Sequence, residues 1–250
     1  RCFIALDGDV TDGDPLQETD PKAAVGSYRG VTISHIVGDN IGKTGCAIAG
    51  IPGHPVRDVS LEDISLRFEG GGSPEQAARL DVPESEANYP EATMFGVLPA
   101  YGFYARHAEN LHLRDLDLDF GAPDARPPLV LQDVERLEIA GLSARADEPA
   151  GCVFRLRNVK DALIHGCRYH GTARRAADVD AGCRDIRITA NAFGKPDITE
   201  GGMEVGLPAE NCFVLSPPSS TDDGPVDSGA TVWQAGFPLL KSISPERKKA

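Results

Sequence analysis

A candidate calcium-binding loop lies near the start of the chain. Asp7, Asp9, Thr11 and Glu18 match ligand positions 1, 3, 5 and 12 of the helix–loop–helix calcium motif. That motif requires glycine at position 6, where this chain has Asp12, and the sequence shows no flanking helices. We therefore interpret the segment as an exposed acidic turn, and we predict no metal site and no cofactor.

The cysteines are the second set of residues that could ligate a metal or react. They are Cys2, Cys46, Cys152, Cys167, Cys183 and Cys212. None forms a C-x-x-C pair and no histidine lies at zinc-finger spacing from one of them, which again predicts no metal site. Cys167 and Cys183 fall at repeat positions that other units fill with Leu or Val, so we expect them to be buried free thiols.

The elements that must position any functional residue are predicted by an internal repeat. Apolar residues recur six times at relative positions −3, 0, +2 and +5, with position 0 at residues 31, 59, 111, 137, 162 and 186. One step between units is about twice the length of the others. A period in the twenties indicates units that cannot bury their own apolar faces and must stack on their neighbours.

Each unit reads as strand, because positions 0 and +2 have the period of a β-strand. A second short apolar run precedes most units, as at 46–48 and 129–131, and Asp or Asn joins the two, as at Asp133 and Asn158. Polar turn residues between two short strands suit the sharp bends of a parallel β-helix. The repeat therefore predicts an all-β, right-handed parallel β-helix with positions 0 and +2 pointing inward, because right-handed connections are the default for parallel strands.

Two other repeat-rich or all-β folds are less compatible with the sequence. A leucine-rich repeat needs a longer, Leu-dense consensus that ends in a structural Asn, and the chain lacks it. A sandwich of antiparallel hairpins needs two-residue Asn-Gly or Asp-Gly turns, which are scarce here.

Composition excludes several function classes. The net charge of −13 disfavours nucleic-acid binding, because no basic stripe is present to neutralise phosphates. No apolar run approaches the length of a membrane span. The repeat predicts coils over 1–195 with an insertion at about 69–101, followed by a partly disordered cap or extension at 196–250. Because the chain begins directly in a strand-like segment, we expect an N-terminally truncated β-helix, the C-terminal part of a longer protein.

The insertion and its surroundings carry a family resemblance. The motifs are GIPGHP at 50–55, VPE at 82–84, YPEA at 89–92, MFGVLPAYGFYARH at 94–107, RPP at 126–128 and QDV at 132–134. With the CFIAL segment at 2–6, they resemble the C-terminal half of bacterial members of glycoside hydrolase family 28, the polygalacturonase-like pectin enzymes. The resemblance covers about residues 1–195. It implies a pectin-lyase-like right-handed solenoid, the fold that the repeat predicts independently.

The catalytic pattern of that family is not matched in this chain. Its Asn-Thr-Asp, Asp-Asp, His-Gly and Arg-Ile-Lys motifs have only partial counterparts at 221–223, 165–166, 170–171 and 187–189. An inverting glycosidase needs two carboxyl groups about 6.5–9.5 Å apart with water between them. No such pair can be named here, so we predict no catalytic residue in this chain, place the catalytic carboxylates before Arg1, and expect the chain alone to be inactive.

The resemblance implies a role in substrate binding for five residues near the insertion. They are Tyr89, Tyr101, Arg106, His107 and His54. The tyrosine rings would stack on sugar faces, and the basic side chains would hydrogen-bond hydroxyl groups or pair with a uronate carboxylate. The alternative is structural: the long loop braces itself, and Arg106 pairs with Glu84 or Glu91.

The resemblance therefore implies part of a secreted or periplasmic, monomeric glycoside hydrolase. Its substrate would be a pectin-type polysaccharide, with galacturonosyl linkages hydrolysed with inversion, and this chain would supply a wall of the cleft. Two alternatives stay open. One is a non-catalytic carbohydrate-binding or adhesive β-helix. The other is a polysaccharide lyase on the same architecture, which needs calcium or a basic residue in place of the acid pair.

Overall fold

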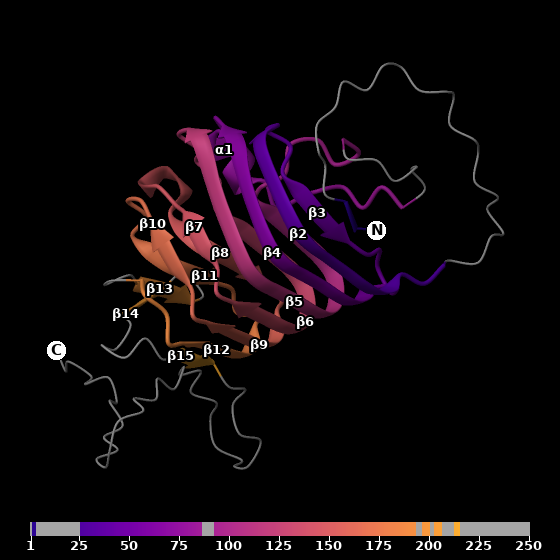
Figure 1. Cartoon of the computed structure of the whole chain (residues 1–250). Helices are drawn as coiled ribbons and strands as arrows, with labels where there is room; N and C mark the ends of the chain where they lie inside the picture. Colours follow the sequence, from indigo (N-terminus) through magenta and orange to yellow (C-terminus); the bar gives the residue numbers. More distant parts are fainter. Residues whose placement is uncertain are drawn as a thin grey trace, which may run out of the picture.

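A computed structural model describes residues 26–86 and 93–193 in full, together with the backbone of short strands at 2–3, 197–200, 203–206 and 213–215. These residues form a parallel β-solenoid of about six turns (Figure 1). The predicted parallel β-helix is confirmed, and its right-handed sense stays a prediction. No helix in the described ranges is long and apolar enough to cross a membrane.

Three parallel ladders, named here A, B and C, run along the solenoid. Ladder A stacks β3 (Cys46–Ala49), the start of β5 (Phe103–Ala122), the start of β6 (Leu129–Ala140), β8 (Cys152–Arg157), β11 (Arg175–Val179) and β13 (Asp197–Glu200). Ladder B stacks β2 (Arg29–Ile41), β4 (Val56–Gly70), the middle of β5, the rest of β6, β9 (Lys160–His165) and β12 (Arg184–Thr189). Ladder C continues the ends of β2, β4 and β5 into β7 (Ser143–Arg145) and β10 (Arg168–His170).

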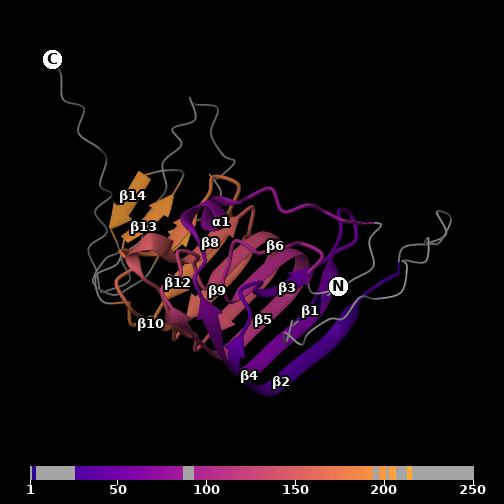
Figure 2. The same ribbon diagram turned by 90° about the horizontal axis from the view of Figure 1, so that it is seen from above.

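The long strands take part in more than one ladder because they bend at the corners of the coil. Strands β2, β4 and β5 lie side by side in both ribbon views (Figures 1 and 2). Three strands pair antiparallel instead: β1 (Cys2–Phe3) with β3, β14 (Met203–Gly206) with β13, and β15 (Phe213–Leu215) with β12. The remainder of the predicted extension at 196–250, and the acidic turn at 7–18, lie outside the described residues.

The sequence repeat corresponds to the inward-facing residues of ladder B. Positions 0 and +2 of successive units are paired in register, as in Leu111 with Leu137 and Leu113 with Ile139. Leu113 and Ile139 are fully buried, so the predicted inward orientation is confirmed. The first unit is the exception, because Ile33 and Ile36 are only partly buried at the end of the described stack.

The corners of the coil explain the Asp and Asn residues of the repeat. Positions −1, +4 and, in three units, −4 have left-handed backbone with φ between +48° and +71°. The column at −1 contains Gly30, Asp58, Asn110, Arg136, Asp161 and Asp185. This conformation costs roughly 1–2 kcal/mol for most L-residues, and Gly, Asn and Asp tolerate it best. The composition of the corners therefore follows from backbone geometry.

Residues 71–102 form the insertion between β4 and β5. It begins with the short helix α1 (Pro74–Ala78), which has a capping box between Ser73 and Gln76. The insertion packs on the outer side of ladder A, where Val82, Phe95 and Leu98 bury Tyr104 and Val130. Ladder A is thus covered on both faces, which is why its strands are almost continuously apolar.

A fully buried ion pair fastens both ends of the insertion to the solenoid. The guanidinium of Arg126 donates to Asp124 at 2.7 and 3.0 Å, to the carbonyl of Lys43 at 2.6 Å and, near the end of the insertion, to the carbonyl of Leu98 at 3.3 Å. Asp124 also accepts the backbone N–H of Gly72 at 2.9 Å. A Cβ on Gly72 would lie 2.2 Å from Arg126 Nε, so only glycine fits there.

The described cysteines are structural. Cys152, Cys167 and Cys183 are buried free thiols, so the expectation for Cys167 and Cys183 is confirmed, and Cys46 is buried as well. Burial raises the pKa of Cys167 to about 11 and that of Cys183 to about 12, which keeps both in the unreactive thiol form. Among the described residues, no group of His, Cys, Asp or Glu side chains is arranged to hold a metal ion.

Candidate functional site: a polar hollow at the corner between ladders A and B

A hollow of about 220 Å³ opens at the corner between ladders A and B; we call it the corner hollow. It is lined by Ile51, Gly53, Pro55, His107, Ala108, Glu109, Asp133, Val134, Glu135, Asn158 and Lys160. Its polar residues occupy positions −4 and −2 of three successive repeat units, and its apolar residues include Ile51, Pro55 and Val134. Apolar surface with a few convergent polar groups is typical of small-molecule and sugar sites.

The −4 column of the hollow is a chain of polar contacts. Asn158 donates from Nδ2 to Asp133 Oδ1 at 2.5 Å, and His107 Nδ1 lies 3.5 Å from Asp133 Oδ2. On its other side, His107 Nε2 lies 3.2 Å from Glu84 of the insertion. The backbone N–H of Asn158 donates to Asp180 at 3.0 Å, which extends the column by one coil. These contacts hold His107, Asp133 and Asn158 in fixed orientations.

The −2 column contains carboxylates and ammonium or guanidinium groups. Glu109 accepts from Arg57 Nε at 2.6 Å and from Arg136, and these hydrogen bonds, that of Arg57 first, lower the pKa of the Glu109 carboxyl. Lys160 is paired in register with Glu135 on the neighbouring strand. Glu109 is therefore tied to two guanidinium groups, whereas Glu135 is exposed to solvent and lies 3.7 Å from one of them, Arg136.

The five predicted binding residues lie in different environments. His107 lines the hollow. His54 is exposed in the turn at its edge, where its backbone N–H donates to the Ile51 carbonyl at 2.9 Å. Tyr89 lies outside the described residues. Tyr101 and Arg106 are buried, and neither lines the hollow.

The predicted stacking role of Tyr101 is wrong in this structure. Its ring is fully buried and packs edge-on against Phe68 and Phe120 inside the solenoid. Its hydroxyl donates to the Arg145 carbonyl at 2.7 Å, and burial raises its pKa well above the ordinary value of 10.0. No face of the ring is available to a sugar.

The predicted sugar contact of Arg106 is also wrong, and the structural alternative describes it correctly. Its guanidinium donates to the carbonyls of Val82 at 2.6 Å and Pro83 at 2.9 Å and lies 3.2 Å from Glu84. Its Nε is buried without a hydrogen bond. Arg106 thus holds the insertion against ladder A and does not reach solvent.

The acceptors and donors at Glu109, Asp133, Glu135, Asn158 and Lys160 were not among the predicted site residues. These residues could have been found from the same repeat, because they occupy its polar positions −4 and −2. Stacking of coils turns these isolated polar residues into two adjacent columns.

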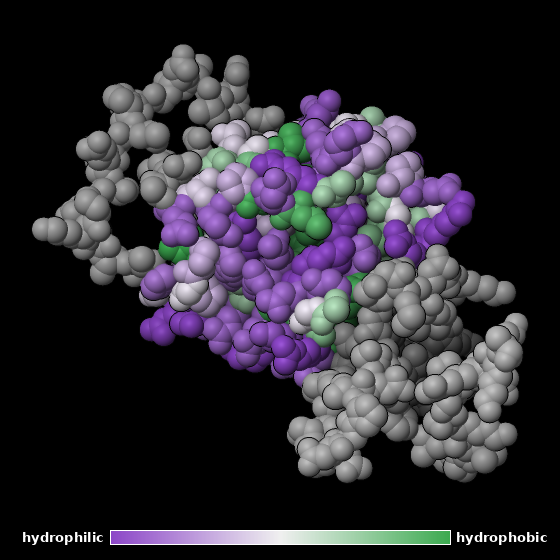
Figure 3. All heavy atoms as spheres, turned by 180° about the vertical axis from the view of Figure 1, so that it is seen from behind, coloured by the Kyte–Doolittle hydropathy of each residue, from purple (hydrophilic) through white to green (hydrophobic). Residues whose placement is uncertain are grey.

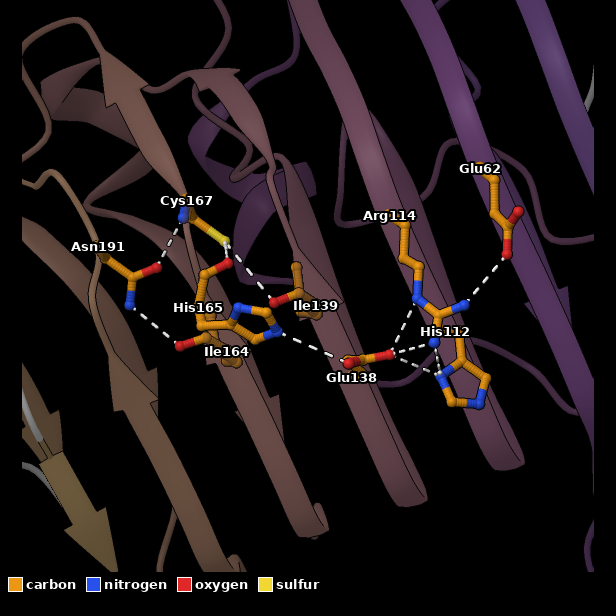
Figure 4. A network of polar contacts seen from close by, with 9 residues as sticks. All are labelled: Glu62, His112, Arg114, Glu138, Ile139, Ile164, His165, Cys167 and Asn191. Carbon is orange, nitrogen blue, oxygen red and sulfur yellow. Dashed lines mark hydrogen bonds and ion pairs between the residues drawn. The ribbon is translucent and has the colours of Figure 1, made fainter.

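A second polar cluster covers the outer face of ladder B (Figure 4). Arg114 donates to Glu138 and, at 3.2 Å, to Glu62, while His112 Nδ1 lies 3.0 Å from Glu138. His165 approaches Glu138 from the next coil at 3.6 Å. Hydrogen bonds, first from Arg114 and then from His112, lower the pKa of Glu138 to about 2. Seen from behind, the surface is mostly hydrophilic, with separate hydrophobic patches (Figure 3).

The low pKa of Glu138 predicts acid-sensitive stability. Because the folded pKa lies below the ordinary value of 4.5, the contribution is present above pH 4.5 and lost as pH falls toward 2. Since the side chain is 27% exposed, we expect Glu138→Gln to lower the free energy of unfolding by about 1 kcal/mol at neutral pH. Urea unfolding across this pH range should show the difference from wild type shrinking with acid. Glu69→Gln, at an exposed position, is the control; a difference independent of pH contradicts the assignment.

Comparisons with known proteins add little to this geometry. No family model matches the chain, and no curated protein matches it. A crystal structure from Parabacteroides merdae, described as a "putative glycosyl hydrolase", aligns with 10% identity and a TM-score of 0.38 over 71% of this chain and 77% of that one. So low a similarity supports no conclusion about function. The resemblance to glycoside hydrolase family 28 therefore stays a prediction.

Proposed function

We propose that this chain is part of a glycoside hydrolase that acts on a pectin-type polysaccharide, and that it supplies a binding surface and not the catalytic acids. The parallel solenoid and the family resemblance of the insertion support the proposal. The fold alone does not define a function, because solenoids of this kind serve several. The argument for a sugar ligand therefore rests on the corner hollow.

The observation that carries the proposal is the composition of the hollow. Asp133 and Glu135 supply acceptors, Lys160 supplies donors, and Ile51 and Pro55 supply apolar surface. A sugar unit has a ring of hydroxyl groups that both donate and accept, around carbon–hydrogen faces that favour apolar contact. Because the columns continue from coil to coil, neighbouring sugar units of one chain can lie along the same corner.

The described carboxylates of the hollow support binding better than hydrolysis. Glu109 is held by Arg57 and Arg136, and Asp133 faces His107 and Asn158. An inverting glycosidase needs one protonated carboxyl group and one carboxylate with space for water between them. A low pKa at Glu109 is the opposite of what a general acid requires. The same observation favours the second candidate, a non-catalytic carbohydrate-binding solenoid.

Binding and hydrolysis measurements on the 250-residue chain test the proposal. In calorimetric or NMR titrations with pectic oligosaccharides, wild type should bind, and Lys160→Ala should weaken binding by about tenfold. Lys43→Ala, an exposed lysine outside the hollow, should have no effect. No reducing ends should be released from the polysaccharide.

Two outcomes contradict the proposal. Absence of any oligosaccharide binding removes the sugar-binding role. Hydrolysis that disappears when an acid of this chain is changed to its amide shows that the catalytic groups lie in this chain and not outside it.

A further inference from the structure

We infer that the corner hollow selects an uncharged sugar unit, such as a methyl-esterified uronate or a neutral hexose, over a free uronate. The inference rests on the proposed function, because it names the class of sugar that the same site accepts. It follows from how the charges around the hollow are already paired.

The hollow has more carboxylates than available cations. Glu109, Asp133 and Glu135 line it, and Lys160 is the one lysine or arginine of its lining. Lys160 is the in-register neighbour of Glu135, so a ligand carboxylate that reaches Lys160 also comes close to the Glu135 carboxylate. A ligand carboxylate placed here would meet several like charges, and such juxtaposition is strongly unfavourable.

The nearby guanidinium groups do not change this balance. Both Arg57 and Arg136 donate to Glu109, at opposite oxygens of its carboxylate, and Arg136 also lies 3.7 Å from Glu135. A uronate could recruit either arginine only by separating it from Glu109 and leaving that carboxylate less compensated. His107 likewise lies between two carboxylates, with Nε2 next to Glu84 and Nδ1 next to Asp133, so neither ring nitrogen is available to a ligand carboxylate.

The corner next to the hollow adds further negative charge. The −1 column contains three aspartates, Asp58, Asp161 and Asp185, against one cation, Arg136, and Asp58 accepts from the amide of Asn110 at 2.7 Å. The whole chain carries a net charge of −13. Local and overall charge therefore act in the same direction, against an anionic ligand.

The hydrogen-bonding capacity of the hollow matches an uncharged sugar instead. Glu135 is exposed, and its oxygens have free acceptor positions, which sugar hydroxyl groups can fill as donors. A methyl ester removes the charge of a uronate while leaving every ring hydroxyl in place. Such an ester satisfies the acceptors without introducing a like charge.

The experiment uses matched oligosaccharides that differ only in charge. Oligogalacturonate and its methyl ester of equal length are titrated into the 250-residue chain at low and at high salt. We expect the ester to bind at least about tenfold more tightly than the free acid at low salt. This difference in affinity, the gap, should narrow at high salt because screening weakens charge repulsion. Glu135→Gln should reduce the difference in affinity between the ester and the free acid severalfold, because the neutral amide no longer repels the ligand carboxylate.

A control and three outcomes make the result decisive. Glu69→Gln removes the same charge from an exposed position outside the hollow and should leave the gap unchanged. Equal or tighter binding of the free acid overturns the selectivity but leaves the proposed function standing. A gap that neither salt nor Glu135→Gln reduces overturns the electrostatic explanation and with it the inference. Failure of both ligands to bind overturns the proposed function itself.

Discussion

Replacing Arg126 with methionine is expected to lower the free energy of unfolding by about 3–5 kcal/mol. The substitution leaves the Asp124 carboxylate buried without its counter-ion and removes the donor to the Lys43 carbonyl. An uncompensated buried charge is among the most destabilising single changes known in proteins. Because Asp124 also accepts the N–H of Gly72, the start of the insertion should loosen with the pair.

Urea unfolding followed by circular dichroism measures the effect. Arg57→Met is the matched control, because Arg57 forms an ion pair with Glu109 but is 53% exposed, and its loss should cost less than about 1 kcal/mol. A double variant, Arg126→Met with Asp124→Leu, should be less destabilised than the sum of the two single variants, since it leaves no unpaired charge. Equal losses for Arg126→Met and Arg57→Met contradict this account of the buried pair.

The part of the fold that repeats could be predicted from the sequence. Ladder B exposes one face and buries the other, so Leu111, Leu113, Leu137 and Ile139 alternate with polar residues and reveal both strand and coil period. The corners could be predicted as well, because left-handed backbone selects Asp, Asn and Gly at fixed positions of the coil. These features depend on local geometry that every coil must satisfy.

The site was only partly predictable, because its geometry depends on contacts that no period encodes. Asp133 and Asn158 are recognisable as corner residues, yet nothing in a single coil shows that His107 stands beside them. The roles of Tyr101 and Arg106 depend on which segments cover them, and an isolated arginine or tyrosine in a strand is usually exposed at least in part. In ladder A the insertion supplies that cover, and its packing is a property of the folded chain alone.

Arg106→Ala should lower the free energy of unfolding by about 3–5 kcal/mol while leaving sugar affinity of the folded protein nearly unchanged. The guanidinium is 1% exposed and donates to the carbonyls of Val82 and Pro83, so its removal leaves buried acceptors without donors and opens a cavity under the insertion. It also packs against the rings of Phe95 and Tyr104, with its centre 5.5 and 5.8 Å from their centroids. Arg106 therefore serves to keep the insertion in place.

Comparing stability and binding in one set of variants tests this assignment of Arg106. Urea unfolding should place Arg106→Ala far below wild type, and Arg106→Lys in between, because lysine keeps the charge but cannot reach both carbonyls with one planar group. Lys160→Ala should behave in the opposite way, with near-normal stability and weakened oligosaccharide binding. If Arg106→Ala is as stable as wild type and loses sugar affinity, the guanidinium reaches the ligand and its role as a brace is wrong. The contrast between the two variants thus separates the residue that holds the insertion from the residue that faces the corner hollow.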